Sequence, residues 1–160
     1  MMPRTGWTAI LLFMHATLVT AQVPEQDKPA IAVIASTADQ DVHLNPTRLS
    51  LIYRRKLRFW LDGRRIHPIN LPVAHPLRQR FSQIVLGSSP KALEDYWRER
   101  YFLGIEPPFV VHSTEAMIRI VAQTKGALGY VDACDVDARV RVLLYVGSNT
   151  QRRPCPTARD

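Results

Sequence analysis

The segment from Arg65 to Phe81 constrains the fold most, because it reads as a strand, a short loop and the start of a helix. Ile66 and Ile69 are β-branched residues typical of a buried strand. Pro76 suits the first position of a helix, where its missing N–H costs no hydrogen bond. The loop therefore leads into a helix N-terminus, whose free N–H groups and positive dipole end favour an anion.

The rest of the chain alternates between strand and helix signals in the same way. Apolar runs predict further strands at 30–36, 109–111, 127–131 and 139–146. Capping residues predict helices that begin at Asn45-Pro46, Ser89-Pro90 and Ser113 or Thr114. This order predicts a single α/β domain over residues 30–146, with a central, mostly parallel sheet flanked by helices.

The helix that follows Pro90 carries three large apolar residues at helical spacing. Leu93, Trp97 and Tyr101 should share one side of it. We predict that Trp97 and Tyr101 are buried and structural, and that Trp97→Ala costs roughly 3–5 kcal/mol if the ring is fully buried.

The first 21 residues have the pattern of a secretory signal peptide. Arg4 is followed by the apolar run from Trp7 to Val19, and small residues precede Gln22. Cleavage after Ala21 is expected, with an uncleaved anchor as the alternative. Residues 22–29 should form a flexible lead and 147–160 a polar tail. The protein is then periplasmic or secreted, and is not an integral membrane protein after cleavage.

Cys134 and Cys155 are the two cysteines of the chain. Exported proteins encounter conditions in which disulfides persist. We predict a Cys134–Cys155 bond that ties the tail to the domain, with two free or intermolecular thiols as the alternative.

The chain carries a formal charge of +7 at pH 7, which favours anionic partners. One stretch concentrates cations beside Phe59 and Trp60, and this basic face consists of Arg54, Arg55, Lys56, Arg58, Arg64 and Arg65. It could bind a protein partner or an anionic surface, or could be a solubilising surface whose apolar neighbours face the core. Nucleic acid is an implausible partner for an exported protein.

No pattern in the sequence indicates catalysis. The chain contains no H-E-x-x-H, C-x-x-C, G-x-S-x-G or P-loop motif, and its histidines show no i, i+4 pair. We therefore expect no enzyme activity, no catalytic residue, no metal site and no cofactor.

Three local patterns together resemble one lobe of the periplasmic phosphate-binding proteins of ABC transporters. The family has an "L-x-x-I-F/Y-x-G-K … W-x-D-G" segment, a strand followed by an anion loop and a helix, and a "P-G-A-I-G-Y-V" segment. Their counterparts here are Leu49–Lys56 with Trp60 and Asp62-Gly63, Ile69–Phe81, and Gly126–Val131. The resemblance implies a periplasmic-binding-protein-like lobe, and the length suits one lobe where full members have two.

The anion loop departs from the family pattern. Relatives have a loop similar to D-G-S-G-T, whereas this chain has Val73-Ala74-His75-Pro76-Leu77. Phosphate coordination therefore does not carry over residue by residue. The candidate ligand-binding residues at this helix N-terminus are His75, Leu77 and Arg78. The alternatives are that His75 merely caps its helix and that Arg78 is a solvated helix residue.

These patterns lead to two hypotheses of function. In the first, the chain is an exported, substrate-binding-protein-like domain that weakly binds phosphate or another small oxyanion in connection with ABC transport. In the second, it is an interaction module that has lost its ligand and uses the basic face to bind a protein partner or an anionic surface.

Overall fold

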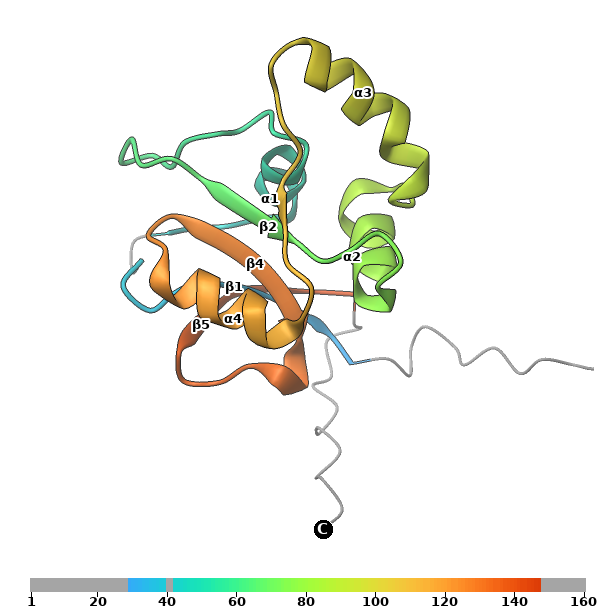
Figure 1. Ribbon diagram of the computed structural model, residues 1–160. Coiled ribbons are helices and arrows are strands. Elements are labelled where there is room, and N and C mark those ends of the chain that lie inside the picture. Colours follow the sequence, from blue (N-terminus) through green and yellow to red (C-terminus); the bar gives the residue numbers. More distant parts are fainter. Residues whose placement is uncertain (1–28, 40–41, 148–160) are drawn as a thin grey trace, which may run out of the picture.

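The computed structural model describes residues 29–39 and 42–147, which form one sheet with helices packed around it (Figure 1). The strands are β1 (Ile31–Ser36), β2 (His67–Asn70), β3 (Phe109–Val110), β4 (Ala127–Asp132) and β5 (Val140–Val146). The helices are α1 (Pro46–Tyr53), α2 (Pro76–Leu86), α3 (Glu94–Phe102) and α4 (Thr114–Gln123), with 3-10 turns η2 (Lys91–Leu93) and η3 (Ala133–Asp135). The predicted signal peptide, nearly all of the lead and nearly all of the tail lie outside the described residues.

The sheet has the strand order β3-β2-β4-β1-β5. Strand β2 pairs in parallel with both β3 and β4, whereas β1 is antiparallel to both β4 and β5. Four strands therefore run in one direction and β1 runs against them. The predicted α/β class with a mostly parallel sheet is confirmed, with the strand at 31–36 as the exception.

The two faces of the sheet are covered by different helices, and strand β4 shows this directly. A Cβ atom on Gly129 would lie 2.6 Å from Met117 Sδ, so α4 packs closely on that face. The neighbouring Tyr130 points to the other face, because side chains alternate along a strand. There its ring stacks on Phe81 of α2, and meets Tyr53 of α1 edge to face.

The start of helix α1 is as the sequence predicts. The Asn45 side chain accepts a hydrogen bond from Arg48 N at 2.8 Å, and the helix buries Leu49, Ile52 and Tyr53. Tyr53 also donates its hydroxyl to the Ile69 carbonyl at 3.0 Å, which ties α1 to the end of β2.

Helix α2 begins at Pro76, as predicted, and ends before Gly87. Ile84 is 39% exposed, whereas Arg78 and Ser82 are buried. Leu77 and Phe81 are buried beside them, so the buried face of α2 also carries a charged side chain inward.

The prediction that Trp97 and Tyr101 are buried is wrong for Tyr101, which is 66% exposed. Trp97 is half-buried, and α3 contains no fully buried residue. The helix leaves the body of the domain after the buried Leu93, and it projects beyond α2 in Figure 1. Tyr96 and Trp97 still pack against the core, whereas Tyr101 lies mostly in solvent.

Cys155 lies outside the described residues, so the Cys134–Cys155 bond stays a prediction. In the two ranges that the structure describes, no helix is long and apolar enough to cross a membrane.

Candidate functional site

Two hollows lie on either side of the loop that joins β2 to α2, at the edge where the parallel strands end. The first, called the His75 hollow, is lined by His75, Leu77, Arg80, Thr114, Asp132 and Asp135, among others. The second, called the Arg78 hollow, is lined by Asn70, Arg78, Trp97, Tyr101, Pro108 and Val110, among others. This edge is where α/β proteins commonly hold ligands.

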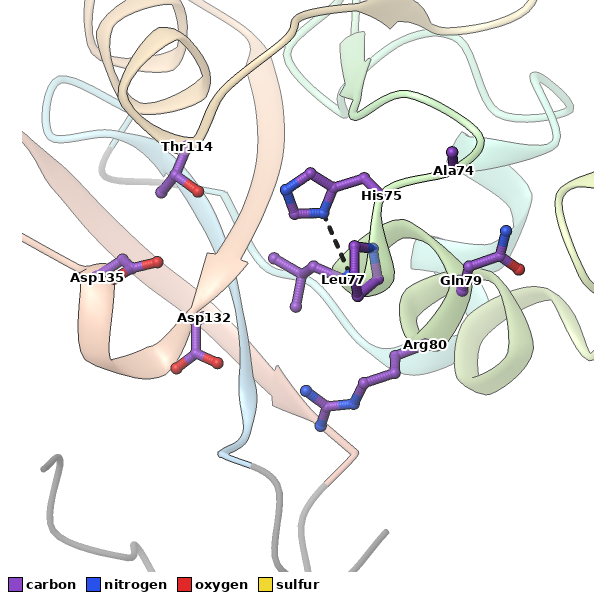
Figure 2. A pocket seen from close by; sticks show the side chains of 9 residues that line it. Ala74, His75, Leu77, Gln79, Arg80, Thr114, Asp132 and Asp135 are labelled. Atoms are coloured by element: carbon purple, nitrogen blue, oxygen red, sulfur yellow. Dashed lines mark hydrogen bonds between the residues drawn. The ribbon is translucent and has the colours of Figure 1, made fainter. Parts of the chain in front are cut away.

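His75 is the N-cap of α2, and Figure 2 shows its ring turned back over the start of the helix. Its Nδ1 atom accepts a hydrogen bond from Leu77 N at 3.2 Å. Pro76 has no N–H, and Gln79 N already donates to the His75 carbonyl at 3.1 Å. The helix N-terminus therefore has few amides left for an anion. His75 acts as a helix cap, which was the alternative to a ligand-binding role.

The His75 hollow also carries two carboxylates opposite that histidine. Asp132 and Asp135 lie across from His75 and Leu77 in Figure 2. Burial, and then the neighbouring Asp132, raise the pKa of the Asp135 carboxyl above its ordinary value. Two nearby negative charges disfavour a third, although Arg80, which lines the same hollow, offsets part of their charge.

The Arg78 hollow contains the opposite charge, and that charge is buried. Arg78 is only 6% exposed, so the alternative of a solvated helix residue is wrong. Its Nε and Nη1 atoms are buried and have no hydrogen-bond partner among the described residues. Burial lowers the pKa of Arg78 below its ordinary value, with Tyr130 and Tyr53 acting against that change. A guanidinium still keeps its proton at neutral pH, so a buried cation remains without a counter-charge.

A small polar network borders this cation. The Tyr130 hydroxyl donates to Asn70 Oδ1 at 3.0 Å and accepts from Leu71 N at 3.3 Å. Burial raises the pKa of Tyr130 to about 12, so the hydroxyl stays protonated at neutral pH. Because Tyr130 occupies the amide oxygen of Asn70, the amide nitrogen is the end that remains to donate to a ligand.

The outer walls of the Arg78 hollow come from α3 and from the chain before and in β3. Trp97 and Tyr101 contribute aromatic rings, while Pro108 and Val110 close the other side. The volume is about 410 Å³, within the range of small-molecule sites.

The three residues predicted to bind a ligand do not converge. His75 and Leu77 line one hollow and Arg78 lines the other. Sequence reasoning missed Asn70 and Tyr130 as part of the site. A polar asparagine at the end of an otherwise buried strand was the signal that could have identified the first of them.

The six residues of the basic face fall into two groups. Three of them make contacts within the domain. Arg54 Nη2 donates to the Leu86 carbonyl at 2.6 Å, and Arg55 Nη1 donates to the Ile66 carbonyl at 3.4 Å. Arg64 forms ion pairs with Asp39 and Asp62. The other three, Lys56, Arg58 and Arg65, are exposed.

Within the described ranges, no group of three or more His, Cys, Asp or Glu side chains could hold a metal ion.

Comparison with known proteins identifies relatives of the fold only. No family model matches the chain, and no curated protein matches it by sequence. Solved structures do match. An ABC-type phosphate transport receptor from Vibrio cholerae is 19% identical with a TM-score of 0.60, over 72% of this chain and 45% of that one. A protein assigned as a phosphate ABC transporter substrate-binding protein from Clostridium perfringens, with bound phosphate, is 18% identical with a TM-score of 0.60, over 72% and 44%.

PstS from Borrelia burgdorferi is a third match, 16% identical with a TM-score of 0.57, over 76% of this chain and 48% of that one. The chain thus spans less than half the length of these proteins. The described part of the chain has a fold similar to part of these phosphate-binding proteins, as the sequence patterns indicated.

Proposed function

We propose that this chain is an exported binding protein, and not an enzyme, that holds an oxyanion in the Arg78 hollow. The buried guanidinium of Arg78 is the observation that carries the proposal, because its Nε and Nη1 atoms find no partner among the described residues. A charge removed from water is costly unless a counter-charge and hydrogen bonds compensate. An oxyanion on Arg78 would supply both.

The surroundings of Arg78 support an anion from outside the chain. A guanidinium offers several donors in one plane, which suits the oxygens of phosphate, sulfate or carboxylate. The amide nitrogen of Asn70 can add a further donor. Glu94 and Arg98 also line this hollow, but both are exposed and carry opposite charges. The phosphate-binding proteins that share the fold make phosphate the first oxyanion to test, and a role in ABC transport follows from the same likeness.

Calorimetric titration with inorganic phosphate and sulfate tests the proposal. We expect weak, millimolar binding to the wild-type chain, because one wall of the hollow stays open to water and salt. Arg78→Gln should abolish that binding. Arg119→Gln is the matched control, since it removes one exposed arginine of α4 that lines neither hollow.

Equal binding by Arg78→Gln and the wild type would place the ion elsewhere and contradict the proposal. Because Arg78 is buried, the fold of the variant should be checked by circular dichroism. Loss of binding with an unchanged spectrum is the supporting result.

The basic face supports a second candidate function, binding of an acidic protein surface or anionic lipid. Exposed Arg58 and Arg65 flank a hairpin that leads into β2, where Phe59 pairs with Arg65. Phe59 is 52% exposed and Leu61 is 89% exposed on the same hairpin. Co-sedimentation with anionic vesicles tests the lipid form, and the double change Arg58→Gln with Arg65→Gln should remove binding while leaving phosphate titration unchanged.

A further inference from the structure

The walls of the Arg78 hollow do not suit a bare inorganic ion. Apart from Arg78 and Asn70, the side chains that face it are mostly aromatic, aliphatic or proline. A small multiply charged ion loses a strongly held water shell on entering and needs many donors in return. The buried side-chain donors in the lining of this hollow are the Arg78 guanidinium and the Asn70 amide.

The size of the hollow leads to the same conclusion. Its volume is about 410 Å³, far more than one oxyanion fills. The rest of the lining includes the α3 aromatics and Pro108, and its other charged residues, Glu94 and Arg98, are exposed. An apolar group would occupy this space favourably because it removes the aromatic surfaces from water.

The exposure of α3 adds an independent observation. Trp97 and Tyr101 both line the hollow, and Tyr101 remains 66% exposed. Exposed aromatic side chains beside a buried cation are typical of a site that binds an amphipathic ligand, with an apolar part against the rings and a charged head on the cation.

We propose that the occupant of the Arg78 hollow is a small organic anion: a phosphate or carboxylate head on Arg78, carried by an apolar body that lies against Trp97 and Tyr101. This inference rests on the proposed function and narrows its ligand class. In this arrangement Arg78 binds the charged head of the ligand, and the α3 aromatics favour organic over inorganic anions.

Titration of the full chain with four probes tests the inference. The probes are inorganic phosphate, phenyl phosphate, benzoate and the uncharged benzyl alcohol. We expect phenyl phosphate to bind about tenfold more tightly than inorganic phosphate, from burial of one ring. Benzoate should also bind more tightly than inorganic phosphate. That result would show that the site accepts a carboxylate as well as a phosphate head group. Benzyl alcohol should not bind measurably, since it lacks the charge for Arg78.

Tyr101→Ala is the informative variant, with Phe102→Ala as its matched control. Both residues are exposed aromatics on α3, at 66% and 82%, but only Tyr101 lines the hollow. Tyr101→Ala should remove most of the advantage of phenyl phosphate and leave inorganic phosphate binding unchanged, whereas Phe102→Ala should change neither.

The outcomes separate this inference from the proposed function. Equal affinity for phosphate and phenyl phosphate overturns the inference and leaves oxyanion binding intact. Absence of binding by every anion overturns both. Tight binding of phenyl phosphate that Tyr101→Ala does not weaken shows that the ring lies elsewhere, and also overturns the inference.

Discussion

The His75 hollow and the Arg78 hollow lie at the same edge of the sheet, yet they have opposite chemistry. The first contains a helix N-terminus whose amides are largely used, and two carboxylates face it. The second contains a buried cation without a partner in the described chain. The difference shows that a helix N-terminus alone does not make an anion site. What matters is which donors remain unpaired and which charges surround them.

The comparison also separates two kinds of energetic cost. In the His75 hollow, like charges meet at a partly exposed surface, where water screens them. In the Arg78 hollow, a single charge has been removed from water without compensation, which is the more costly case. A bound anion can relieve the second cost. Substitutions that remove the buried charge should therefore have the larger effects on stability and binding.

The largest expected effect is that of Arg78→Met. Methionine fills much of the same space without a charge, so the free energy of unfolding of the ligand-free protein should rise by about 1–4 kcal/mol. Anion binding should be lost at the same time. Urea unfolding with and without phosphate measures both quantities.

Arg48→Met is a comparison variant, because Arg48 also has a buried Nε atom without a partner but lines neither hollow. It should leave anion binding intact. A fall in stability on Arg78→Met would indicate that the arginine is already compensated within the chain, and the two hollows would then differ little in energetic cost.

The sequence predicted most of the fold because its local signals agreed with one another. Asn45 and Pro46 mark the start of α1, Pro76 marks the start of α2, and the run at 127–131 gives β4. The reversed direction of β1 could not be read from the pattern, because a buried strand is a continuous apolar run whether its neighbours are parallel or antiparallel.

The candidate site was less predictable, since it depends on which way a few side chains turn. Helical spacing grouped Trp97 and Tyr101 correctly on one side of α3, but spacing does not say whether that side meets the core or a hollow. Similarly, the sequence placed His75 and Arg78 three residues apart at a helix start. Only the packing of α2 shows that they line different hollows.

The next largest effect is expected for His75→Ala. The side chain caps α2 through Leu77 N, and loss of an N-cap costs typically about 1 kcal/mol. His75→Asn should restore most of this stability, because asparagine caps a helix through its own side-chain oxygen. Thermal unfolding of the three proteins measures the difference.

Both His75 variants should bind phosphate as the wild type does, because the ion is held on the other side of the loop. A loss of phosphate binding in His75→Ala that His75→Asn does not restore would assign the histidine to the ligand and reverse the contrast between the two hollows.

The smallest effect concerns the acidity of the His75 hollow and is expected for Asp135→Asn. Burial, and then Asp132, raise the pKa of Asp135 in the folded protein above its ordinary 3.8. The folded state therefore binds this proton more tightly than the unfolded state does, so the ionised carboxylate lowers stability at neutral pH. Asp135→Asn should raise the melting temperature slightly at neutral pH. The gain should shrink as the pH falls through the raised pKa and vanish below 3.8, where both states are protonated.

Glu99→Gln, which neutralises an exposed acid of α3, changes the net charge equally and should show no such pH dependence. A gain that is the same at every pH, or that Glu99→Gln reproduces, would mean that overall charge and not the local pairing of carboxylates distinguishes the His75 hollow from its neighbour.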